Sequence, residues 1–203
     1  MTMGHGRRVV ASIIGVVLLG SAGVSAQDNT ASRAARTWRQ GHERAILDEF
    51  VALLRLPNIA SDRAGIQRNA EAIAEMMRRR GLSPRLLTVE GANPVVFGEI
   101  RTPGATRTIG FYAHYDGQPL DPREWTSPPF EPTLRDARGQ AILLPAAGAP
   151  IDPEWRVYAR SAGDDKAPIV ALMSAIDALR AAGLSLKANV KFAFEGEEEA
   201  GSA

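Results

Sequence analysis

Residues 164–199 read DDKAPIVALMSAIDALRAAGLSLKANVKFAFEGEEE and join a helical pattern to a strand pattern. Apolar residues recur at helical spacing up to Gly183, a residue typical of the position just after a helix. The following run, KANVKFAF at 187–194, is short and apolar, which is typical of a buried strand. A helix followed directly by a buried strand indicates an α/β fold.

The remaining sequence repeats this alternation on the N-terminal side. Apolar spacing and the Pro and Gly residues that end each run predict two early helices, three strands, and a Pro-rich loop before the helix at 164–183. These segments are 37–55 and 64–80 (helices), 84–91, 94–101 and 106–114 (strands, the last one buried), and 117–132 (loop). Residues 140–153 follow no clear pattern and are interpreted as an insertion. We therefore expect an α/β fold with a mixed or mostly parallel sheet flanked by helices.

Composition narrows the possible functions. The 203 residues are 45% apolar and 23% charged with a formal net charge of +1, so nothing indicates nucleic-acid binding. The chain contains no Cys, which excludes disulfides, thiolate metal sites and a Cys nucleophile.

The N-terminus predicts a signal peptide over residues 1–26. Arg7 and Arg8 precede the apolar run VVASIIGVVLLG, and the small residues SAGVSA follow it, with cleavage expected after Ala26. The apolar run is short for a membrane span, although an uncleaved anchor is the alternative. The protein is therefore expected to be exported, periplasmic or secreted, without a stable membrane span after cleavage. Residues 27–37 are polar and are interpreted as a flexible leader.

Acidic and His residues gather at the ends of predicted strands or at the start of a helix. The segments are FYAHYDGQP at 111–119, RSAGDDKAP at 160–168 and FEGEEEAGS at 194–202. In open α/β sheets, ligands bind at the carboxyl ends of strands. Each segment also has a simpler explanation by itself: a His satisfied by a nearby Asp, an Asp that caps a helix, and a solvated acidic loop.

Together the segments favour a metal site over these separate explanations. His114 and Asp116 lie two residues apart, so their side chains leave an extended backbone on the same face. One His with several carboxylates suits a binuclear zinc site, whereas calcium prefers carbonyl oxygens without His. Serine catalysis lacks a convincing base, because no other His follows the first predicted helix.

The motifs HYD, DDK and EGEEEAGS resemble, in order and spacing, those of a zinc metallopeptidase family. This family includes glutamate carboxypeptidase, carnosinase-type dipeptidases, aminoacylases and succinyl-diaminopimelate desuccinylase. The resemblance covers about residues 40–203. It implies zinc-dependent hydrolysis of peptide or amide bonds in dipeptides, short peptides or N-acyl amino acids. The sequence departs from the family at Ser161 and Ala167, where Gly is usual.

The resemblance also implies a role for each matched residue. His114 and Glu199 each bind one zinc, and Asp164 bridges two zinc ions and forms a cis peptide bond with Asp165. Asp116 orients His114, and Glu198 is the general base. Glu197 is then a bystander, although three consecutive glutamates allow the assignment to shift by one residue.

The family uses further groups after its glutamate motif. These are another acidic ligand, a His near the C-terminus, and an inserted lid and dimerisation domain. The resemblance therefore implies that residues 38–203 form the N-terminal portion of a metallopeptidase catalytic domain, inactive alone, whose full-length parent can form a homodimer. The alternatives are a non-catalytic truncated product and an exported cation-binding module.

Overall fold

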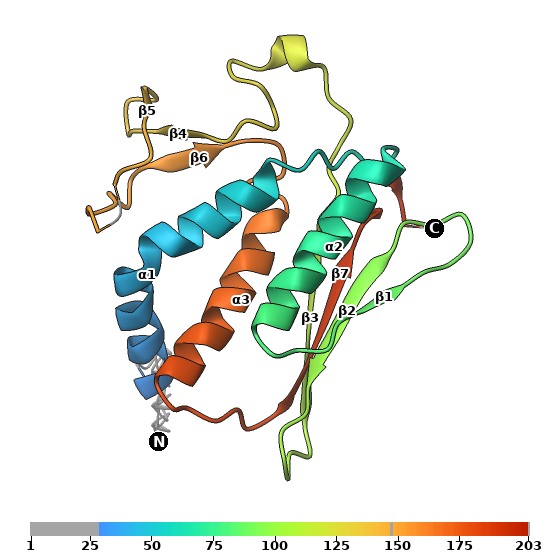
Figure 1. Cartoon of the computed structure of the whole chain (residues 1–203), viewed down its shortest axis with the longest axis vertical. Helices are drawn as coiled ribbons and strands as arrows, with labels where there is room; N and C mark the ends of the chain where they lie inside the picture. The colour runs from blue at the N-terminus through green and yellow to red at the C-terminus, as the bar shows by residue number, and fades with distance from the viewer. Residues whose placement is uncertain (1–28, 147, 203) are drawn as a thin grey trace, which may run out of the picture.

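The computed structural model describes residues 29–146 and 148–202, and it has the expected α/β fold (Figure 1). The predicted signal peptide over 1–26 lies outside the described residues. The helices are α1 (Thr30–Leu54), α2 (Arg63–Arg79) and α3 (Lys166–Ala181), with short 3₁₀ turns η1 (Pro122–Glu124) and η2 (Glu198–Ala200). The strands are β1 (Arg85–Leu87), β2 (Val95–Ile100), β3 (Thr108–His114), β4 (Thr133–Arg135), β5 (Ala141–Ile142), β6 (Arg156–Tyr158) and β7 (Asn189–Glu195).

The first helix begins earlier than the sequence pattern predicts. Asn29 caps α1 by accepting a hydrogen bond from the Ser32 N–H at 2.8 Å, so residues 30–37 are helical where a flexible leader was expected. The segment is polar overall, which suggested a flexible leader. It also contains several Ala and Arg residues, which are strong helix formers, and Asn is a favourable N-cap residue. No helix within the described part of the chain combines the length and apolar character that a membrane crossing requires.

The main sheet is mixed rather than mostly parallel. Its strands follow the order β1-β2-β7-β3 in the described residues, and of these pairs β3 and β7 run parallel while the others are antiparallel. The register pairs Ala113 with Phe194 and His114 with Glu195. This parallel register brings the carboxyl ends of β3 and β7 level, so the segments that follow them lie side by side.

Strand β3 was predicted to be buried, but most of it is exposed. Ile109 is 49% exposed, Phe111 38% and Tyr112 57%, because β3 is an outer strand and pairs only with β7 in the described part of the chain. Only its last residues, Ala113 and His114, are buried. An apolar run in sequence does not distinguish an outer strand from a central one.

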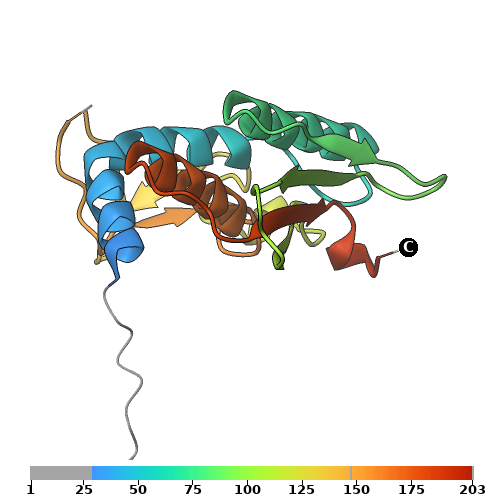
Figure 2. The same ribbon diagram turned by 90° about the horizontal axis from the view of Figure 1, so that it is seen from below.

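The core lies between the helices and the main sheet. Figure 2 shows α2 over the sheet, with α3 and α1 on its β3 side. Phe192 and Phe194 of β7 pack in one buried cluster with side chains of α2 and α3, including Met77 and Met173.

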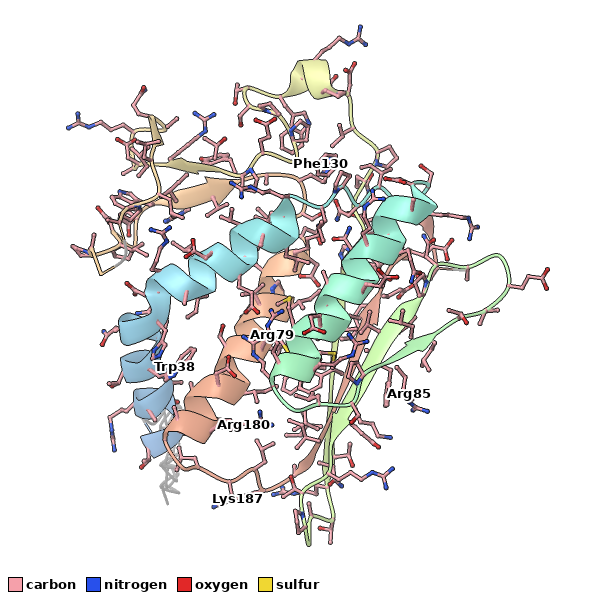
Figure 3. The ribbon with its side chains drawn as sticks, in the orientation of Figure 1. Trp38, Arg79, Arg85, Phe130, Arg180 and Lys187 are labelled. Carbon is pink, nitrogen blue, oxygen red and sulfur yellow. The ribbon has the colours of Figure 1, made fainter. Side chains whose placement is uncertain are left out.

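An ion-pair cluster joins the three helices at the C-terminal end of α2. The Arg80 guanidinium donates to Glu49 of α1 and to Asp177 of α3, with closest distances of 2.8 Å. Arg79, which is labelled in Figure 3, donates a further hydrogen bond to Glu49 at 2.8 Å.

Residues 140–153, which the sequence left unassigned, contribute to a small second sheet. Leu134 of β4 pairs with Ile142 of β5 on one side and with Val157 of β6 on the other. This sheet leads through residues 159–165 into the start of α3, and so it delivers the Asp164–Asp165 pair to the end of β3.

Candidate metal centre

His114 is the central residue of the candidate site. It is the last residue of β3 and is buried, and its Nε2 lies 2.9 Å from Asp164 Oδ1 and 3.7 Å from Glu198 Oε2. Its Nδ1 lies 3.3 Å from Asp116 Oδ1, a close contact that lacks hydrogen-bond geometry, so this nitrogen has no hydrogen-bond partner among the described residues. The imidazole therefore faces carboxylates through both nitrogens.

His114, Asp164 and Glu199 form a potential ligand set. One nitrogen or oxygen from each side chain lies within 4.8 Å of the others. Asp164 is mostly exposed and Glu199 is partly buried, which leaves the cluster open on one side. These residues come from β3, the loop before α3, and η2. One imidazole and two carboxylates are donors that suit zinc, and they are the residues that the sequence resemblance assigns to the metal.

The acidic pair before α3 is not a simple helix cap. Asp165 stands at the N-cap of α3, yet its side chain makes no capping hydrogen bond within the described chain. Its Oδ2 instead accepts a hydrogen bond from the His114 N–H at 3.3 Å. The peptide bond between Asp164 and Asp165 is cis. Both aspartates thus contact His114, one through the ring and one through the backbone.

Asp116 connects His114 to the glutamate turn. Its carboxylate is fully buried and accepts hydrogen bonds from the backbone N–H groups of Glu198 (3.2 Å) and Glu199 (3.0 Å). Burial raises the pKa of Asp116, against the opposing effects of the Glu199 N–H and the charge of His114. The contact with His114 was expected from the sequence, whereas the two bonds to the glutamate turn were not.

The three consecutive glutamates point to different partners. Glu197 accepts a hydrogen bond from the Asn93 N–H at 3.0 Å, away from the ligand set. Glu198 faces His114, and Glu199 accepts a hydrogen bond from Gln118 Nε2 at 2.6 Å. The structure thus places Glu198 and Glu199 at the cluster and Glu197 outside it. The division of roles between base and ligand remains a prediction.

Buried asparagines hold the loops of the site, and sequence reasoning missed them. Asn58 is fully buried, and its Nδ2 donates to the Tyr115 carbonyl (2.6 Å) and to Ser161 Oγ (2.9 Å). Asn93 Nδ2 donates to the Gly196 carbonyl at 2.9 Å. A single Asn in a loop gives no pattern that would reveal these distant partners.

Lys166 was also missed, because a Lys beside two acids resembles a surface residue. It is fully buried, and its Nζ donates to the carbonyls of Leu53 and Leu56 at 3.0 Å each. Burial lowers its pKa to about 7. Lys166 therefore joins the end of α1 to the start of α3, directly after the acidic pair.

The acidic surroundings set the electrostatics of His114. Burial by itself would lower its pKa, but the hydrogen bond to Asp164 and the charges of Asp116, Asp165 and Glu198 outweigh burial and raise it. A site with this excess of negative charge favours a bound cation.

Comparison with known proteins agrees with the geometry. Residues 110–203 match the model of peptidase family M20/M25/M40. The chain is 34% identical over 110 residues to a Beta-Ala-His dipeptidase of Homo sapiens, covering 54% of this chain and 18% of that protein. It is 31% identical over 110 residues to a Cys-Gly metallodipeptidase of Schizosaccharomyces pombe, covering 54% of this chain and 20% of that protein.

Solved structures extend the similarity beyond the matched segment. The crystal structure of an M20 family metallo-carboxypeptidase from Sulfolobus solfataricus superposes with a TM-score of 0.61 at 34% identity, over 77% of this chain and 31% of that one. The aligned part of the chain spans about a fifth of each of the two dipeptidases named above. Residues 110–203 match the M20/M25/M40 family model, and the resemblance inferred from the motifs is confirmed over this part of the chain.

Proposed function

We propose that this chain supplies metal-binding residues of a zinc-dependent hydrolase that cleaves peptide or amide bonds. The observation that carries the proposal is the convergence of His114, Asp164 and Glu199 within 4.8 Å, inside the segment that matches the M20 family. Two relatives are named dipeptidases and one solved relative is named a carboxypeptidase, which supports small peptides as the substrate class. N-acyl amino acids remain in the proposed range.

The residues present fit the proposed metal. His114 Nε2 and carboxylate oxygens of Asp164 and Glu199 would hold zinc, with Asp164 bridging in a site for two ions. The net negative surroundings of the imidazole would offset the charge of the ions. When bound, zinc polarises a scissile carbonyl and lowers the pKa of water.

The chain's own groups then have distinct tasks. Glu198 faces the cluster but does not belong to the ligand set. We assign to Glu198 the role of general base, which takes a proton from the attacking water and passes it to the leaving amine. Asp116 contacts His114 and accepts hydrogen bonds from the backbone of the glutamate turn, so it fixes the general base and the metal ligands relative to one another.

Further parts of the proposal concern the whole protein. The N-terminal pattern over residues 1–26 supports export to the periplasm or beyond, and the resemblance supports a homodimer. For the 203-residue chain by itself we propose zinc binding without turnover. The resemblance implies a further acidic ligand and a further His after the glutamate motif, and these 203 residues contain no His after His114.

Zinc content and hydrolysis, measured on the full-length parent protein and its variants, test the proposal. His114→Ala should abolish zinc retention, whereas Glu198→Gln should retain zinc and lose dipeptide or N-acyl amino acid hydrolysis. His42→Ala is the matched control, because His42 stacks on Trp38 on the exposed side of α1 and should be silent. A protein that tolerates His114→Ala and prefers calcium would instead be a cation-binding module.

A further inference from the structure

We infer that Gln118 is a positioning residue that holds Glu199 in the orientation of a metal ligand and selects it from the glutamate run. The inference rests on the proposed zinc site. Gln118 Nε2 donates to Glu199 Oε2 at 2.6 Å, although both side chains reach the surface.

The backbone next to Gln118 is held in place by a hydrogen bond and by close packing. The N–H of the preceding residue, Gly117, donates to the carbonyl of Asn58 at 2.9 Å. A Cβ at Gly117 would lie 2.6 Å from Ser161 Oγ and 2.9 Å from Arg160 Cδ, so the chain passes too close to its neighbours to shift freely. An exposed side chain that starts from such a point loses less conformational freedom when it forms a bond.

The backbone of Glu199 is anchored as well. Its N–H donates to the buried carboxylate of Asp116 at 3.0 Å. The bond between Gln118 and Glu199 therefore joins two fixed points, unlike an exposed pair on a flexible surface. The amide N–H occupies Glu199 Oε2 and leaves Oε1 available to bind a metal ion.

This bond also distinguishes the three glutamates. Glu197 is held by the Asn93 N–H and Glu198 faces His114, so Glu199 is the member of the run that receives a side-chain amide. Carboxylate ligands of metals are commonly hydrogen-bonded by a second group, and loss of that group typically lowers metal affinity about 10- to 100-fold. The amide of Gln118 is the group in this position for Glu199.

The test is the zinc dissociation constant of the chain and of Gln118→Met, measured by competition with a chelator of known affinity. Met keeps the length of the side chain and removes the N–H donor, so we expect affinity to fall roughly 10-fold. Gln67→Met is the matched control: Gln67 Nε2 donates to Glu71 Oε1 at 2.8 Å on the exposed face of α2, and its loss should leave zinc affinity unchanged.

A double-mutant cycle shows whether Gln118 acts through Glu199. In a Glu199→Ala background, Gln118→Met should cost no further affinity. An equal cost in both backgrounds, or a Gln118→Met variant that binds zinc like Gln67→Met, would overturn the inference while leaving the proposed zinc site intact. Failure of the unmodified chain to bind zinc would overturn the proposed function, and this inference with it. Thermal unfolding of the metal-free variants separates loss of positioning from loss of fold.

Discussion

Replacement of Gly196 by Ala tests how tightly the glutamate turn is packed. Gly196 is buried directly after β7 and lies against the ring of Tyr115, which is fully buried and donates a hydrogen bond to the Pro94 carbonyl. A Cβ at position 196 would lie 2.5 Å from Tyr115 Oη and 2.6 Å from Cζ. The ring is rigid and enclosed, so the turn that carries Glu198 and Glu199 has to move instead.

The expected cost follows from two opposing effects. Overpacking of a buried position typically costs about 1–3 kcal/mol. Replacement of Gly by Ala restricts the unfolded chain and returns about 0.4–1 kcal/mol. The free energy of unfolding should therefore fall by roughly 1–2 kcal/mol. For a chain of this length, that corresponds to a melting temperature lower by roughly 2–8 °C.

Thermal or urea unfolding of the metal-free protein measures this effect, with Gly110→Ala as the matched control. Gly110 also belongs to the main sheet, and a Cβ there meets no atom of the described residues within 4 Å, so this variant should be stabilised by about 0.4–1 kcal/mol. Because the glutamate turn moves in Gly196→Ala, zinc affinity should fall in that variant and stay unchanged in Gly110→Ala. Equal stability of the two variants would refute the packing argument.

The remaining predictions concern protons and ion pairs. The surroundings of His114 raise its pKa, so zinc must displace a proton from the imidazole, and zinc affinity should rise as pH increases from 6 to 8. Calorimetry in buffers of different ionisation enthalpy measures this proton release. A zinc affinity that does not change with pH would contradict the prediction. Burial lowers the pKa of Lys166 from 10.5 to about 7, so the unfolded state binds more protons between these values and the free energy of unfolding should rise with pH across this range. Lys166→Met should flatten that rise, and an unchanged slope would rule Lys166 out as its source. Arg80→Met should lower the free energy of unfolding by roughly 2–3 kcal/mol, because Glu49 and Asp177 lose their shared partner in a largely buried setting. Arg78→Met, which removes only an exposed pair with Glu75, is its control in the same denaturation assay.

The sequence predicted best those elements whose signals lie in residues that are close together along the chain. The bounds of α2 and α3 follow from apolar spacing, and Gly81 and Gly183 adopt the positive φ that is typical of the residue after a helix. The segments that form the candidate site were also recognisable, because a His-x-Asp, an Asp-Asp-Lys and a glutamate run are short patterns of adjacent residues. Their convergence was expected from the rule that ligands bind at strand ends.

The features that only the tertiary structure decided depend on contacts between residues that are distant in the sequence. Exposure of β3 follows from its outer place in the sheet, and burial of Lys166 follows from the end of α1 packing over it. The three glutamates are chemically identical and adjacent, so no local pattern separates them. Asn93, Asp116 and Gln118 do so, from positions 81 to 104 residues earlier along the chain. Residue type determined what chemistry this protein could perform, and long-range packing determined which side chains face the site.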